Sequence, residues 1–166
     1  MYGNQEIQPI TEDALPRPIN HYGNVKLCIE NTIRTFNYQA HTKILIARIS
    51  NPYGPGQDFN KGVGFIDAAI KKTIRSEKIE IWGDGNNVRD YIYIDDVCRM
   101  LISLFYYQED YDTFNISSNT GTSQRDVIQM LEAMQLAPQV EYLPARSVDA
   151  KKIILNNERI MSIHAV

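Results

Sequence analysis

A tyrosine and a lysine, four residues apart, lie near the start of a helical pattern. Asn20 is suited to cap a helix over residues 21–39, and Tyr22 and Lys26 would then share one face of that helix. A lysine ammonium close to a phenol favours the phenolate. Such a pair could take a proton from a hydroxyl while hydride leaves the same carbon. Tyrosine and lysine are both common in this chain, so chance also explains the spacing taken alone.

A second polar residue stands where a strand is expected to end. The apolar run "KILIARI" (43–49) predicts a buried strand of a parallel sheet, and Asn51 follows it at the start of a loop rich in proline and glycine. Ligands of open α/β sheets bind at the carboxyl ends of strands. The Asn51 amide could therefore meet a phosphate or sugar oxygen, or it could close its own turn as an Asx residue.

Two arginines are candidates for anion binding. Arg89 follows the dipeptide "DG" at 84–85, which predicts a tight, hairpin-like turn, and Arg146 stands three residues before Asp149 in "LPARSVD". Arginine recognises phosphate through two parallel hydrogen bonds, and a carboxylate can accept hydrogen bonds from ribose hydroxyls. The ordinary alternatives are a solvated charge at Arg89 and a surface salt bridge between Arg146 and Asp149. The sequence contains no glycine-rich dinucleotide fingerprint.

The remaining patterns alternate between helix and strand, which indicates an α/β protein. Helices are predicted at 21–39, 62–75, 95–107 and 122–134, and strands at 43–49, 78–83, 89–94, 113–117, 139–143 and 151–155.

Composition narrows the class of partner. The net charge of −3 is spread along 166 residues without a basic block, which argues against nucleic acid and membrane surfaces as partners. We find neither a signal-peptide pattern nor an apolar run long enough to span a bilayer. Cys28 and Cys98 lie inside apolar helical patterns and are predicted to be buried free thiols, which suits the cytoplasm.

The order of these features resembles one family. The stretches that carry the resemblance are "YGNQEIQPITEDALPRPINHYGNVK", "ARISNPYGPGQ", "IEIWGDGNNVRDYIYIDDV", "FNISSNTGTS" and "LPARSVD". Over residues 2–155 the chain resembles the carboxyl-terminal half of the extended short-chain dehydrogenase/reductases, most closely nucleotide-sugar epimerases of the UDP-glucose 4-epimerase type. The resemblance implies the remnant of a Rossmann-like parallel sheet in residues 1–60 and a small α/β substrate-binding domain in residues 61–166.

The resemblance also implies a catalytic and cofactor-binding group. Tyr22 corresponds to the general base and acid that exchanges a proton with the sugar 4-hydroxyl. Lys26 corresponds to the residue that holds the nicotinamide ribose of NAD and assists the tyrosine. Ile49 falls beside the nicotinamide.

The other residues carried over concern the UDP-sugar. Asn51 corresponds to the asparagine that contacts the diphosphate, and Arg89 and Arg146 to the arginines that clamp it. Asp149 corresponds to an acid near the uridine ribose. Trp82 falls where the family places a side chain against the base, although a strand tryptophan is as often part of the core.

The chain departs from the family pattern at three places. It lacks the glycine-rich βαβ unit. Met1 stands directly before "YG", so the serine or threonine that the family carries upstream of this motif is absent, and Val148 replaces a glycine. We therefore expect a fragment that binds no NAD by itself and is inactive in isolation. The exposed stripe of helix 21–39 is expected to drive homo-oligomerisation. A nucleotide-sugar 4,6-dehydratase fragment and a non-catalytic nucleotide-sugar-binding or interaction module are the alternatives.

Overall fold

The structure is a computed structural model that describes residues 1–57, 64–145 and 150–164. In chain order its elements are α1 (His21–Ala40), β1 (Ile46–Ile49), β2 (Asn51–Tyr53), α2 (Phe65–Ile74), β3 (Lys78–Trp82), β4 (Val88–Tyr93), α3 (Ile94–Phe105), β5 (Thr113–Ile116), β6 (Gly121–Ser123), α4 (Gln124–Ala133), β7 (Gln139–Leu143), β8 (Lys152–Ile153) and α5 (Glu158–His164).

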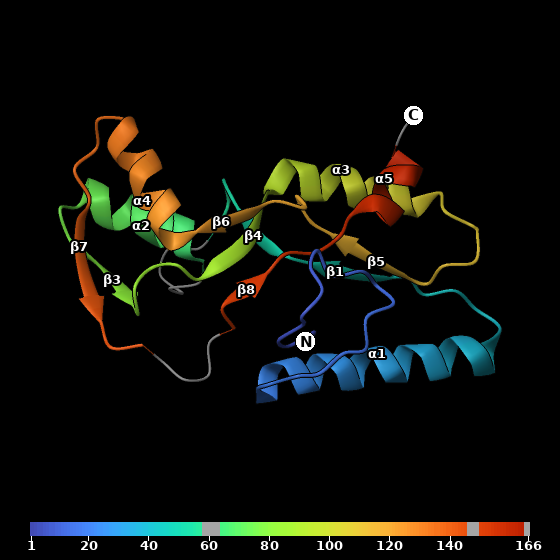
Figure 1. The fold of residues 1–166 in the computed structure, drawn as a ribbon. Coiled ribbons are helices and arrows are strands. Elements are labelled where there is room, and N and C mark those ends of the chain that lie inside the picture. Colours follow the sequence, from blue (N-terminus) through green and yellow to red (C-terminus); the bar gives the residue numbers. More distant parts are fainter. Residues whose placement is uncertain (58–63, 146–149, 165–166) are drawn as a thin grey trace.

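One end of the molecule is built on a parallel strand pair. β1 and β5 run parallel, with Ile46 opposite Thr113 and Ile49 opposite Ile116, and α1, α3 and α5 lie at the same end (Figure 1). The core of this end consists of Ile92, Val97, Met100, Leu104, Phe114, Ile116 and Ile160. Leu45 and Ala47 pack against that core, so it draws on both sides of residue 60. The division into residues 1–60 and 61–166 stays a prediction.

The other end has its own core. β3 and β7 pair in parallel, and α2 and α4 lie beside them (Figure 1). Its buried residues are Ala69, Ile79, Ile81, Ile128 and Leu131. Because the two ends have separate cores, the strand between them determines which residues of the two ends lie close together.

β4 is that joining strand (Figure 1). It pairs in parallel with β2 and with β8, and antiparallel with β6. Asn51 on β2 lies opposite Tyr91 on β4, which is two residues along that strand from Arg89. The strand pairing therefore brings two predicted ligand-binding residues to one place.

The α/β class, the parallel strand at "KILIARI" and the helix capped by Asn20 are confirmed. Two local expectations are wrong. Asn51–Tyr53 is a short strand rather than loop, because β4 offers it a parallel partner. β3 and β4 do not form a hairpin around the "DG" turn, because β3 pairs with β7 instead.

Both cysteines are exposed, which corrects the prediction of buried thiols. Gly23 and Glu30 are the buried residues of α1, so Cys28 lies off the face that packs. On α3 the buried positions are Val97, Met100 and Leu104, and Cys98 lies outside that stripe.

The apolar stripe of α1 is uncovered. Tyr22, Val25, Ile29 and Phe36 are all exposed. Within the ranges that the structure describes, β1 has β5 as its only strand partner. In the same ranges, no helix has the length and hydropathy needed to cross a membrane.

Candidate functional site

A cavity of about 500 Å³ lies between the first turns of α1 and the end of β1. Its lining includes five residues that the sequence singled out, namely Tyr22, Lys26, Ile49, Asn51 and Arg89. Lys26 Nζ lies 5.3 Å from the centre of the Tyr22 ring, and 72% of Tyr22 is exposed. The phenol and the ammonium therefore share one open face, as the helical spacing predicts.

The start of α1 is set by local hydrogen bonding. Asn20 Oδ1 accepts a hydrogen bond from the Gly23 backbone N–H at 2.8 Å, which caps the helix. Each further step of four residues returns to the same face, so Tyr22, Lys26 and Glu30 are aligned. Glu30 is 5% exposed and anchors this face to the body of the protein.

The anchor is a buried ion pair that the sequence reasoning missed. Arg48 on β1 donates to both oxygens of Glu30, from Nε at 3.0 Å and from Nη2 at 2.7 Å. Arg48 Nη1 also donates to the Tyr2 hydroxyl at 2.6 Å and to the Glu12 carbonyl at 3.2 Å. The only signal in the sequence was a charged residue, Arg48, inside the apolar run "KILIARI".

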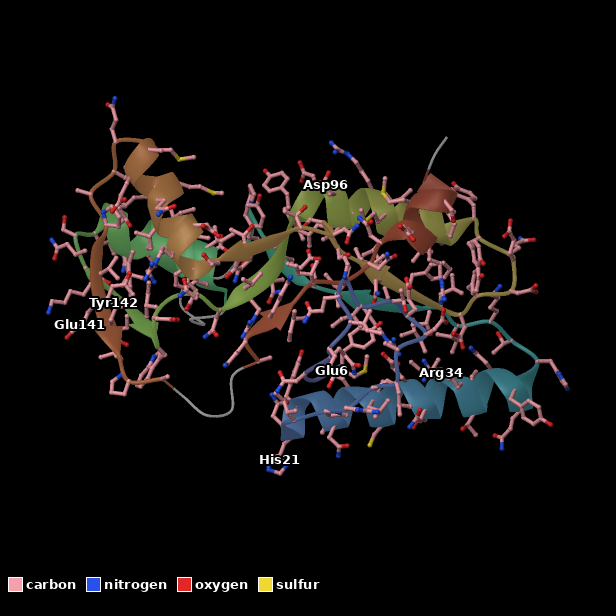
Figure 2. The ribbon with its side chains drawn as sticks, in the orientation of Figure 1. Glu6, His21, Arg34, Asp96, Glu141 and Tyr142 are labelled. Atoms are coloured by element: carbon pink, nitrogen blue, oxygen red, sulfur yellow. The ribbon has the colours of Figure 1, made fainter. Side chains whose placement is uncertain are left out.

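The Tyr2 hydroxyl continues this network into β5. It donates to Asn115 Oδ1 at 2.7 Å, and Asn115 is fully buried opposite Arg48 in the strand register. Burial raises the pKa of Tyr2 above its usual value. Tyr2 is therefore a neutral hydrogen-bonding link at physiological pH. Arg34, which extends from α1 in Figure 2, extends the network toward the surface, because it pairs with both Glu30 and Asp112.

A second cavity, of about 280 Å³, adjoins the first. Asn51 and Arg89 line both cavities, and Trp82 and Tyr91 line the second. Asn51 Nδ2 donates to the Asp90 carbonyl at 2.9 Å, and Arg89 Nη1 donates to the Val88 carbonyl at 2.8 Å. The half-buried Trp82 is thus a wall residue of a cavity beside the two shared side chains.

Two polar atoms in the wall of this second cavity lack a hydrogen-bond partner among the described residues. They are Asp67 Oδ2 and Gln124 Oε1. Asp67 is 6% exposed and belongs to the first turn of α2. Buried acceptors without a donor are costly, so water or an N–H group of a ligand would stabilise this wall.

Arg146 and Asp149 fall outside the described residues. Of the other predicted site residues, five meet at the first cavity, and Trp82 joins Asn51 and Arg89 at the second. In the part of the chain that the structure describes, no cluster of histidine, cysteine and carboxylate side chains is arranged to hold a metal ion.

The structure is thus an α/β protein with two adjoining cavities that share Asn51 of β2 and Arg89 of β4. Residues 1–117 match the model of the NAD dependent epimerase/dehydratase family. The chain therefore belongs to this family, as the ordered motifs predicted.

Relatives show what kind of proteins share the fold. The chain is 33% identical over 126 residues to the dTDP-L-rhamnose 4-epimerase of Burkholderia thailandensis, which covers 75% of this chain and 35% of that protein. The UDP-glucose 4-epimerase of Thermotoga maritima, solved with UDP-glucose, superposes with a TM-score of 0.89 at 31% identity and covers 97% of this chain and 52% of that one.

A third relative was solved with a cofactor. MoeE5, in complex with UDP-glucuronic acid and NAD, superposes with a TM-score of 0.88 at 30% identity, covering 99% of this chain and 55% of that chain. This chain thus spans about half the length of these solved structures, and a smaller share of the rhamnose epimerase.

Proposed function

We propose that this chain is the substrate-binding part of an NAD-dependent nucleotide-sugar 4-epimerase whose substrate is a UDP-hexose. The observation that carries the proposal is the line of side chains along two adjoining cavities. Tyr22 and Lys26 stand at one end, Asn51 and Arg89 in the middle and Trp82 at the other end. This order matches the order of sugar, diphosphate and base in a nucleotide sugar.

The middle of the groove is assigned to the diphosphate. Arg89 would donate charge-assisted hydrogen bonds to phosphate oxygens, and Asn51 would add a neutral amide donor. Arg146 and Asp149 are assigned to the diphosphate and the uridine ribose on the resemblance alone. Trp82 would offer its ring face to the base in the smaller cavity.

The end beside α1 is assigned to the sugar. The Tyr22 hydroxyl is open to the cavity and would exchange a proton with the sugar 4-hydroxyl. The Lys26 ammonium would stabilise the phenolate and donate to ribose hydroxyls of the cofactor.

The residues present fit the nicotinamide-ribose end of NAD, because a hydroxyl, an ammonium and the apolar Ile49 border one cavity of about 500 Å³. NAD, when bound, would accept and return a hydride at the sugar carbon. Tyr22 would exchange the proton of the sugar 4-hydroxyl, and Lys26 and Ile49 would orient the cofactor. We also propose that the exposed face of α1 joins two copies of the protein.

Binding of UDP-glucose, measured by calorimetry or ligand-observed NMR, tests the proposal. Arg89→Ala should weaken binding by roughly 10- to 100-fold, which is the effect of losing charge-assisted hydrogen bonds. Arg99→Ala is the matched control, because Arg99 is an exposed arginine of α3 paired with Asp96. Tyr22→Phe should leave the affinity for UDP unchanged, because the tyrosine addresses the sugar. Equal affinity of wild type and Arg89→Ala for UDP-glucose would reject the site.

Product analysis in the presence of NAD tests the expectation that the chain is inactive in isolation, and any turnover would separate the two enzymatic alternatives. Conversion of UDP-glucose to UDP-galactose that is lost in Tyr22→Phe would assign a 4-epimerase. Loss of water from the sugar would assign a 4,6-dehydratase instead.

A further inference from the structure

A buried carboxylate lies on β4 between two residues of the groove. Asp90 follows Arg89 and precedes Tyr91, and it has no exposed surface. Its side chain accepts four hydrogen bonds. The donors are the Ser50 hydroxyl at 3.3 Å, the Ser118 N–H at 2.9 Å, the Ser118 hydroxyl at 2.8 Å and the Leu155 N–H at 3.1 Å.

These donors bring three separate segments together. Ser50 links β1 to β2, Ser118 follows β5, and Leu155 follows β8. The Asp90 carboxylate therefore fixes β4 against the ends of three strands. One of them, β1, leads directly into Asn51.

Asn51 is bonded to the backbone of the same residue. Its Nδ2 donates to the Asp90 backbone carbonyl at 2.9 Å, while its neighbour Ser50 donates to the Asp90 carboxylate. Two bonds to one residue thus set both the backbone before Asn51 and the direction of its amide. Asn51 and Arg89 are the residues that both cavities share.

Stability alone does not explain a carboxylate at this position. Its four donors are neutral groups, so its charge is buried without a cation among the contacts described above. Burial raises the pKa of Asp90 above the usual range of an aspartate.

We propose that Asp90 is a positioning residue that holds Asn51 in the orientation needed to bind the diphosphate of a nucleotide sugar. Its carboxylate does so by tying Ser50, the residue before Asn51, to β4, and its backbone carbonyl accepts the Asn51 amide. The inference rests on the proposed function, because it assumes that Asn51 contacts the ligand.

A double-mutant cycle tests this role, with UDP-glucose affinity as the measured quantity. Asp90→Asn should weaken binding about tenfold, because it weakens the bonds that the Asp90 carboxylate accepts from Ser50 and Ser118. Ser118→Ala should weaken binding about threefold, because it removes a hydroxyl that holds this carboxylate in place. In an Asn51→Ala background, both changes should have an effect below about twofold. Ser103→Ala is the matched control, since it removes a serine hydroxyl that donates to the Met100 carbonyl on α3.

A merely structural role predicts a different result. It would give the same fold-change in the wild-type and Asn51→Ala backgrounds, and that outcome overturns the inference. If Asp90→Asn does not fold, Ser118→Ala supplies the cycle, and an unchanged affinity in Ser118→Ala counts against the role. Absence of UDP-glucose binding in the wild type rejects the proposed function and this inference together. Binding that depends on Arg89 but not on Asp90 or Ser118 rejects the inference alone.

Discussion

Removing the Glu30 carboxylate should detach the helix that carries Tyr22 and Lys26. Gly23 and Glu30 are the only buried residues of α1, and glycine has no side chain to pack. Glu30 forms a bidentate pair with Arg48, and the two side chains are 7% and 6% exposed. The orientation of α1 against β1 therefore depends on this pair more than on apolar contacts.

The size of the effect follows from what remains after the change. In Glu30→Ala, Arg48 keeps its bonds to the Tyr2 hydroxyl and the Glu12 carbonyl but loses its buried counter-charge. Breaking a buried ion pair by removing one partner costs about 3–5 kcal/mol. Domains of this kind have a free energy of unfolding of about 5–15 kcal/mol, so at least about a fifth of the stability is at stake. Glu30→Gln should cost roughly half as much, because its amide oxygen still accepts one hydrogen bond.

Urea unfolding followed by far-UV circular dichroism measures both losses. Glu141→Ala is the control. Glu141 lies on β7, at the end of the molecule away from α1 (Figure 2), and pairs with Lys78 at 3.2 Å with both side chains exposed. Its loss should cost less than about 1 kcal/mol. A Glu30→Ala variant as stable as Glu141→Ala would refute the reasoning.

Replacing Ser123 by alanine should lower the free energy of unfolding by about 1 kcal/mol, because the Ser123 hydroxyl accepts the Asp126 N–H at 3.0 Å and caps α4; unchanged urea unfolding would contradict this. Ile29→Glu should shift the mass measured by light scattering toward monomer, since it places a charge in the exposed stripe of α1; a wild type that is already monomeric at micromolar concentration would disprove it. The raised pKa of Asp90 means that folding favours its protonated form. The contribution of this group to the free energy of unfolding is therefore present at low pH and is lost as pH rises through the raised pKa. The stability difference between wild type and Asp90→Asn should accordingly grow in favour of wild type as pH falls from neutrality, and a constant difference would exclude this linkage.

The elements that the sequence predicted well are those whose cause is local. Asn20 and the spacing of apolar residues define α1 within its own segment, and "KILIARI" reads as a buried strand without any partner in view. β2 and β8 are only three and two residues long and exist because β4 pairs with them. No local pattern specifies such a partner, and the same limit made the "DG" turn look like a hairpin.

The site divides in the same way. Tyr22 and Asn51 were proposed as site residues because their types and neighbours suggest chemistry and because the order of the motifs resembles one family. Glu30, Arg48 and Asp90 were missed because a charged residue in a buried pattern acquires meaning only from its partner, and these partners are distant in the chain. Arg48 meets Glu30 across 18 residues, and Asp90 meets Leu155 across 65.

The buried pair also affects how the cavity would treat an anion. Lys26, Glu30, Arg48 and Arg89 all line the larger cavity. Glu30 and Arg48 neutralise each other through two hydrogen bonds, so together they add no net charge to the cavity wall. Lys26 near the start of α1 and Arg89 on β4 are the other basic side chains of this lining. On the proposed function, a ligand with an anionic centre and a hydroxyl-rich end would place its phosphates at Arg89 and its hydroxyls between Lys26 and Tyr22, which is the orientation that the proposed proton exchange by Tyr22 requires.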